Sequence, residues 1–213
     1  MTLKPAATKE IIELLNQHHH DFYSLVDISR RTQHPVPMDT RGWSQILASV
    51  VTGIPGVARK KGADLADGSD VKGANTWEAI DTPRFNGVIK AGTKATSSDS
   101  LQSLDIQPYL FMILWDHNSS NEARCRIWCI RTKVDGVFRQ MCKQWYQQRA
   151  AGFIKSNNFQ LHPPRGKDSN VIRNKCGNLD YPLLLNAVKP EGKSYKIIDF
   201  DISVMTSGNC TKV

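Results

Sequence analysis

Three segments of the chain carry apolar residues at the spacing of one helical face. They are residues 7–17, residues 39–53 and the stretch that follows Asp135. Gly53 and Pro55 end the second segment, and Asp135 is a residue type that caps the start of a helix. The pattern therefore predicts three amphipathic helices. Their expected buried positions are Ile11, Leu14 and Leu15; Trp43, Ile46, Leu47, Val50 and Val51; and Val137, Met141, Cys142 and Trp145.

Other segments have the pattern of strands. Residues 109–115 form a continuous apolar run of strand length, and residues 124–132 form a second run beyond the turn DHNSSNE, so the two predict a central hairpin. Residues 195–205 add a strand near the end, and a shorter one stops at Pro163. Helices and strands in this order predict a mixed α/β sheet flanked by helices.

The stretch KKGADLADGSDVKGANTW, residues 60–77, predicts a further hairpin around an Asp-Gly turn. Side chains two apart on a strand share a face, so Asp70 and Lys72 point the same way. A two-residue turn would direct Asp64 to the opposite face. A three-residue loop, 67–69, instead pairs Asp64 with Lys72 and brings the three side chains together.

Composition excludes several protein classes. The chain has 213 residues, 40% of them hydrophobic, and no apolar run near the roughly 20 residues of a membrane span. The N-terminus does not resemble a secretory signal, which favours the cytoplasm. Five cysteines without a CxxC pair indicate neither a disulfide framework nor a zinc ribbon. The run 18–20, three histidines without spaced partners, is more typical of a polar helix end than of a metal site.

The charge points to a polyanionic partner. Lys and Arg number 28 against 20 acidic residues, a net charge of +8. Lysine and arginine side chains that neutralise phosphates release counterions, which supplies affinity for nucleic acid without reading its sequence.

Asp64, Asp70 and Lys72 are also the side-chain types that phosphodiester hydrolysis needs. Mg²⁺ held by one or two carboxylates neutralises charge on the phosphate oxygens and makes a bound water nucleophilic. A nearby ammonium group orients that water and stabilises the transition state. The alternative interpretation is a solvated surface hairpin.

The arrangement resembles the PD-(D/E)xK signature of metal-dependent nucleases: Asp64, a short turn, then Asp70-Val71-Lys72, with Ala63 in place of the signature proline. The order of the flanking elements resembles the αβββαβ core of that superfamily. The chain's size and the run DVKGANTWEAIDTPRFNGVIKAG are similar to those of type II restriction endonucleases, in particular the MamI-like group.

The resemblance implies a restriction-modification hydrolase that makes Mg²⁺-dependent, sequence-specific double-strand breaks in DNA, commonly as a homodimer beside a DNA methyltransferase that acts on the same site. By position, Asp64 and Asp70 would bind one or two Mg²⁺ ions with the backbone carbonyl of Val71, and Lys72 would position the attacking water. Candidates for a further ligand from a preceding helix are Glu10 and Glu13, with Gln45 as an uncharged alternative.

We expect one nuclease domain over residues 1–213, with a core at about 39–162 and a candidate DNA-recognition region at 163–213. Basic residues before the hairpin are suited to phosphate contacts, and Arg and Asn in the loop after residue 162 are suited to reading bases. A polar surface of ordinary function is the alternative for both segments. The candidates are Arg59, Lys60 and Lys61, then Arg165, Asn170, Arg173, Asn174 and Lys175.

Two other functions fit the sequence. A repair nuclease or junction resolvase would share the fold and the metal chemistry. A non-catalytic DNA-binding protein, such as a repressor, would use the hairpin only as structure, but the sequence contains no pair of short helices with the glycine turn of a helix-turn-helix motif.

Overall fold

The computed structural model describes residues 7–31, 39–57, 62–89, 101–208 and 211–212. The helices are α1 (Thr8–Ser24), α2 (Val26–Arg31), α3 (Arg41–Thr52), α4 (Gln102–Asp105), α5 (Gly136–Ala150) and α6 (Val204–Ser207). The strands are β1 (Asp70–Asn75), β2 (Phe85–Asn86), β3 (Leu110–His117), β4 (Ala123–Ile130), β5 (Gln160–Leu161), β6 (Val171–Asn174), β7 (Gly177–Asp180), β8 (Leu183–Lys189), β9 (Lys196–Phe200) and β10 (Thr211–Lys212).

The main sheet has five strands in the order β1-β3-β4-β8-β9. β1 runs parallel to β3, and the other neighbours are antiparallel, so the sheet is mixed. The predicted central hairpin is confirmed as β3 and β4. β8 and β9 of this sheet lie beyond residue 162, and α1 lies before residue 39.

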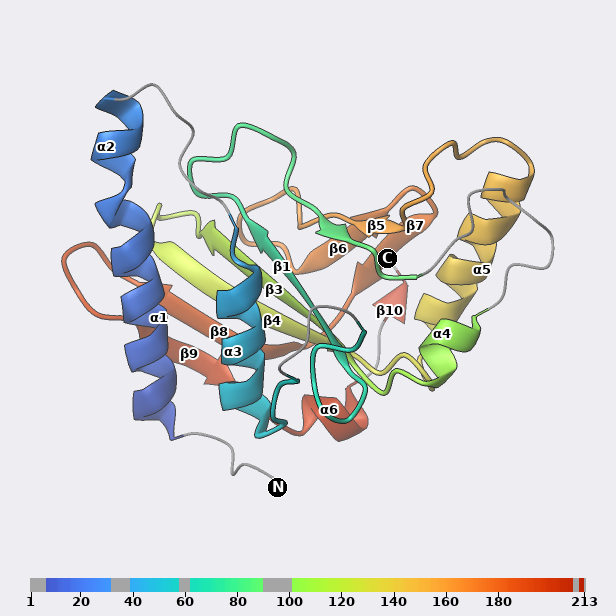
Figure 1. The fold of residues 1–213 in the computed structure, drawn as a ribbon, viewed down its shortest axis with the longest axis horizontal. Coiled ribbons are helices and arrows are strands. Elements are labelled where there is room, and N and C mark those ends of the chain that lie inside the picture. The colour runs from blue at the N-terminus through green and yellow to red at the C-terminus, as the bar shows by residue number, and fades with distance from the viewer. Residues whose placement is uncertain (1–6, 32–38, 58–61, 90–100, 209–210, 213) are drawn as a thin grey trace.

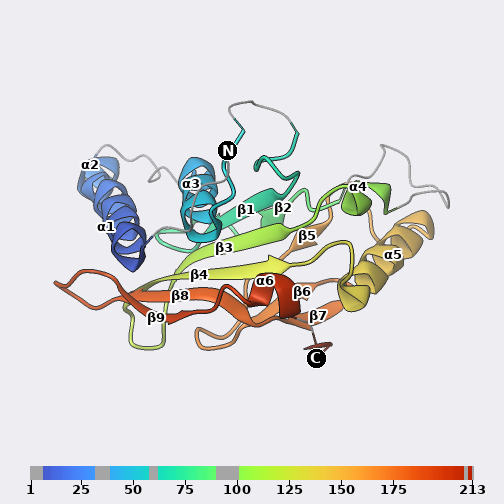
Figure 2. The ribbon, with the colours of Figure 1, turned by 90° about the horizontal axis from the view of Figure 1, so that it is seen from below.

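The sheet separates two apolar cores. Helices α1 and α3 lie side by side over one face (Figures 1 and 2), where they pack on Phe111, Ile113 and Trp115 of β3. The alternate residues of the same strand, including Leu110 and Met112, face α5 and the small strands β5 to β7. Strand alternation explains how one continuous apolar strand supplies both cores.

The predicted helices form, and most of their buried positions are confirmed. Asp135 caps α5, since its Oδ1 accepts a hydrogen bond from the Phe138 amide at 2.9 Å. Ile46 is an exception, because it is 52% exposed and Ser44 and Ala48 are buried instead. α3 lies so close to β1 at Gly73 that only small side chains fit between them.

We expect Gly73→Ala to lower the free energy of unfolding by about 1–3 kcal/mol, the usual cost of overpacking a core. A Cβ at Gly73 would lie 2.5 Å from Ser44 Oγ and 3.2 Å from Ser44 Cβ. Denaturant unfolding measures the change. Gly42→Ala is the matched control, because a Cβ there meets no atom within 4 Å and alanine favours the helix. Equal stability of the two variants would contradict the close approach.

The expectation of a polar helix end at residues 18–20 is wrong. α1 continues to Ser24, and His18 is only 3% exposed, with its ring 4.0 Å from that of Trp115. Burial among aromatic rings, followed by the nearby His19, lowers the pKa of His18 to about 4. His18 is therefore neutral at pH 7, and it is a buried residue of the contact between α1 and β3.

The His18 pKa predicts acid sensitivity. A histidine whose pKa is lower in the folded chain stabilises the fold above its ordinary pKa of 6.5, and this contribution is lost as the pH falls towards 4. When the pH falls from 7 to 5, we expect the lowered pKa of His18 alone to reduce the free energy of unfolding by about 2 kcal/mol. Unfolding of wild type and His18→Phe at both pH values measures it, and equal losses in the two proteins would refute it.

The hairpin predicted over residues 60–77 is also wrong in its pairing. Within the described residues no strand precedes the turn, and β1 pairs in parallel with β3 instead. The Ser69 carbonyl accepts hydrogen bonds from the amides of both Asp64 and Leu65, each at 3.1 Å, so the chain closes a compact loop rather than a ladder. Asp64 therefore does not lie opposite Lys72.

No helix in the described part of the chain is both long and apolar enough to cross a membrane.

Candidate active site

A cleft of about 1310 Å³ opens along β1, the edge strand of the main sheet. The start of α3 forms one wall, and the segments around β2 and α4 form another. Asp64, Asp70, Val71 and Lys72 line this cleft together with Gln45 of α3. The structure thus brings together the residues that the sequence selected, although not through the predicted hairpin.

The two carboxylates meet at one backbone amide. The Val71 N–H lies 2.9 Å from Asp64 Oδ2 and 3.1 Å from Asp70 Oδ1, and it donates to both. The compact loop closed by Ser69 returns Asp64 to the edge of β1, which explains why Asp64 reaches this amide without strand pairing. Two negative groups are therefore held side by side before any ligand enters.

Lys72 neutralises part of this charge. Its Nζ lies 2.7 Å from Asp70 Oδ2, and both side chains are about four-fifths buried. Asp70 and Lys72 are two residues apart on β1, as expected from strand alternation, and they share one face. An ammonium group thus lies directly beside one of the carboxylates.

The direction of the Val71 amide also places its carbonyl. In a strand, the N–H and the C=O of one residue point to the same edge. Because the Val71 N–H bonds the carboxylates rather than β3, its carbonyl is on the outer edge of β1, on the side of Asp64. Oxygen atoms of three groups, the Asp64 and Asp70 carboxylates and the Val71 carbonyl, therefore gather at this edge.

Burial and the neighbouring carboxylate raise the pKa of Asp64 to about 6. Desolvation is the largest cause, followed by the contact with the Asp70 carboxyl, while the Val71 amide acts in the opposite direction. An Asp with a raised pKa is held in an unfavourable charged state near pH 7. A cation bound between the two carboxylates would relieve that repulsion.

The structure places Gln45, rather than Glu10 or Glu13, beside the carboxylates. Gln45 Nε2 donates to Asp64 Oδ1 at 2.7 Å. Glu10 and Glu13 lie on the exposed side of α1, and neither lines the cleft. Glu13 Oε1 instead lies 3.7 Å from Lys9 Nζ. The group that reaches Asp64 from a preceding helix is thus an amide, which fixes the carboxylate without adding charge.

The oxygen donors fit a hard divalent cation. Mg²⁺ is usually bound through one or two carboxylates and keeps several waters, so a dense cluster of acidic groups is not required. Among the described residues no group of three or more His, Cys, Asp or Glu side chains could hold a metal. The donor atoms of Asp64, Asp70 and the Val71 carbonyl are all oxygens, which suits a hard divalent cation better than zinc.

The predicted basic residues have different positions. Arg59, Lys60 and Lys61 lie outside the described residues. Arg165 and Lys175 are exposed, on the loop before β6 and on the β6–β7 turn. The other three, Asn170, Arg173 and Asn174, are partly buried and use side-chain atoms within the protein: Arg173 Nε donates to the Pro163 carbonyl, and Asn174 Nδ2 donates to the Gln160 carbonyl.

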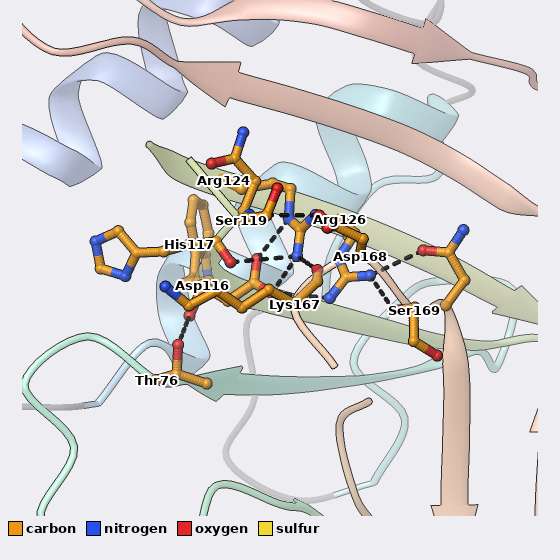
Figure 3. A network of polar contacts seen from close by, with 12 residues as sticks. Thr76, Asp116, His117, Ser119, Arg124, Arg126, Lys167, Asp168 and Ser169 are labelled. Carbon is orange, nitrogen blue, oxygen red and sulfur yellow. Dashed lines mark hydrogen bonds and ion pairs between the residues drawn. The ribbon is translucent and has the colours of Figure 1, made fainter. Parts of the chain in front are cut away.

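A buried ion network fixes the loop that carries part of this segment (Figure 3). Asp116 of β3 accepts two hydrogen bonds from Arg124, at 2.8 and 3.0 Å, and one from Arg126 at 2.8 Å. Arg124 also donates to the Lys167 carbonyl, and Arg126 donates to the Ser169 carbonyl at 2.6 Å. Arg126 Nη1 bonds Asn170 Oδ1 at 2.8 Å as well. The loop at 167–170 is thus held against the sheet by two arginines.

Sequence reasoning missed other polar residues of the cleft. Arg41, Asn75, Arg84, Asn86 and Gln107 line it, yet they come from separate elements. No local pattern could have joined these residues, since they meet only when α3, β1, β2 and the segment after α4 come together in the fold. Strand alternation could not have selected Asn75, because it shares a face of β1 with Gly73, opposite to the face of Asp70 and Lys72.

Comparisons with known proteins identify the family of the chain. The family model of the MamI restriction endonuclease matches residues 27–192. The type II restriction enzyme MamI of Microbacterium ammoniaphilum is 36% identical over 166 residues, which cover 72% of this chain and 53% of that protein. The chain therefore spans about half the length of this relative. No solved structure matches the chain. The match over most of its length shows that the chain belongs to the MamI restriction endonuclease family.

Proposed function

We propose that this chain cleaves double-stranded DNA at specific sites as a type II restriction endonuclease, with Mg²⁺ as its cofactor. The observation that carries the proposal is the convergence of Asp64, Asp70 and Lys72 at the open edge of β1, in a chain of this family. A cleft of about 1310 Å³ gives the site room for a phosphate backbone.

Each residue has a distinct task in this proposal. Asp64, Asp70 and the Val71 carbonyl would hold one or two Mg²⁺ ions, which supply charge neutralisation and an activated water when bound. Gln45 and the Val71 amide keep the carboxylates in place through hydrogen bonds at 2.7 to 3.1 Å. Lys72 presents N–H donors and a positive charge beside Asp70, where they would orient the water and stabilise the negative phosphate.

A plasmid digest with Mg²⁺ tests this function. Discrete fragments are the expected result. Random nicking, or cutting selective for branched DNA, would favour a repair nuclease or a junction resolvase with the same chemistry. Intact plasmid at every salt concentration would favour a non-catalytic DNA-binding protein.

The proposal includes partners. Two copies around a two-fold axis would present two active sites to the two strands of a symmetric target, so we propose a homodimer on DNA. A methyltransferase that modifies the same site would protect the host DNA. Both partners follow from the family, and sedimentation on DNA tests the first.

We expect the affinity for DNA to fall steeply with salt when Ca²⁺ replaces Mg²⁺ to prevent cleavage. The net charge of +8 suits several phosphate contacts, and each contact contributes about −0.9 to the slope of log affinity against log salt. Filter binding from 50 to 200 mM salt measures this slope. Affinity independent of salt would count against a DNA substrate.

A further inference from the structure

A second polar site lies in the same cleft, at the N-terminal end of α3. We propose that Thr40, Arg41, Asn75 and the first turn of α3 bind a backbone phosphate of DNA other than the one that is cleaved. This proposal rests on the proposed DNA substrate and adds a contact that fixes the position of the strand beside the carboxylates.

The first turn of α3 offers free hydrogen-bond donors. Thr40 precedes the helix and is buried, but its side chain makes no capping hydrogen bond. The Arg41 amide donates to Asp39 Oδ1 at 2.9 Å, whereas the Gly42 amide bonds no group in the described part of the chain. The N-terminus of a twelve-residue helix attracts anions through such amides and through the helix dipole.

Asn75 supplies an independent sign of a ligand. It is 6% exposed and lines the cleft, yet its Nδ2 has no hydrogen-bond partner among the described residues. The Oδ1 atom accepts the Trp77 amide at 2.7 Å, which fixes the orientation of the side-chain amide and leaves the NH₂ group as the free end. A buried donor without a partner is energetically unfavourable, and a ligand oxygen would remove that cost.

Gly73 brings the two parts of the site together. A Cβ at Gly73 would lie 3.0 Å from Thr40 Oγ1, so the start of α3 rests on this residue of β1. Asn75 is two residues further on, on the same face of the strand. Its partner across the ladder, Trp115, donates Nε1 to Ser44 Oγ at 3.2 Å. Asn75 and the start of α3 therefore lie on the same face of β1, and both line the cleft.

The chemistry of the site selects a phosphate over a base. The free groups are the Arg41 guanidinium, the Asn75 NH₂ and a helix amide, all of which donate. A base edge in the major groove usually presents both donors and acceptors, whereas phosphate oxygens only accept. Arg41 is exposed and forms no ion pair within the described residues, so its charge is available. The exposed Asp39 carboxylate lines the same cleft, and its negative charge would repel a phosphate.

Three variants test the proposal through DNA affinity in Ca²⁺. Arg41→Ala should weaken binding about tenfold, equally on unrelated DNA sequences, and should reduce the salt slope by about 1. Asn75→Asp keeps the acceptor for Trp77 but brings a carboxylate to the phosphate, and it should weaken binding at least tenfold. Asp39→Asn keeps the cap on Arg41 and should tighten binding, a gain that misfolding cannot mimic.

Lys143→Ala is the matched control, because it removes one positive charge from the exposed side of α5, away from the cleft. It should leave the affinity and the salt slope nearly unchanged. The phosphate site is refuted if Arg41→Ala behaves like Lys143→Ala, or if its loss is confined to one DNA sequence. A wild type that binds no DNA would instead refute the proposed function itself.

Discussion

Replacing Lys72 with alanine should reduce DNA cleavage by about a hundred- to a thousandfold, the usual cost of losing one transition-state donor. The Lys72 ammonium lies 2.7 Å from Asp70 Oδ2 and is the cation at the carboxylate pair. Its removal takes away the group that would orient the water, but it leaves Asp64, Asp70 and the Val71 carbonyl in place. Divalent metal should therefore still bind.

Rates of plasmid cleavage and calorimetric titration with Mg²⁺ measure the two effects separately. A melting curve checks that the variant is folded, as we expect for a partly exposed position on an edge strand. Near-normal cutting by Lys72→Ala would show that Lys72 has only a structural role, as the ion-pair partner of Asp70.

Asp70→Asn should strongly reduce metal binding and cleavage together. The substitution keeps the shape of the side chain, and its remaining oxygen can still accept the Val71 amide, which is 3.1 Å away in the wild type. It removes a negative ligand, however. We expect metal affinity to fall by more than the roughly 10- to 100-fold that loss of an outer-shell partner costs. DNA should bind equally well or more tightly, because repulsion between carboxylate and phosphate is relieved.

The two variants together separate the roles at the site. Lys72→Ala should lose cleavage and keep metal, whereas Asp70→Asn should lose both and keep DNA. Normal Mg²⁺ affinity in Asp70→Asn would show that this carboxylate is not a ligand, and the metal site would then have to be sought elsewhere in the cleft.

The sequence predicted those features of the fold that depend on periodicity. The long apolar strand at β3, its hairpin partner β4 and the helices α1, α3 and α5 follow from local patterns. The exposure of Ile46 and the burial of His18 do not, because each depends on how closely a helix packs on the sheet. A helical pattern shows which side is apolar but not which neighbour is close.

The three central residues of the candidate site were predictable from the sequence, but their geometry was not. Asp70 and Lys72 share a face through strand alternation, which needs no tertiary information. Asp64 reaches them through a loop closed by Ser69 and through a hydrogen bond from Gln45, and neither contact follows from turn statistics. Outside the site, the ion pairs of Asp116 with Arg124 and Arg126 also depend on tertiary structure, because the two arginines lie on the neighbouring strand.

The position of β1 at the edge of the sheet limits how copies of the protein can associate. Edge strands present unpaired amides that invite another strand, a common route to aggregation. Here the Val71 amide already donates to two carboxylates, and their negative charges oppose pairing with another strand. Two copies cannot join their sheets through β1 without burying Asp64 and Asp70. We therefore expect any symmetric assembly of this protein to use another surface.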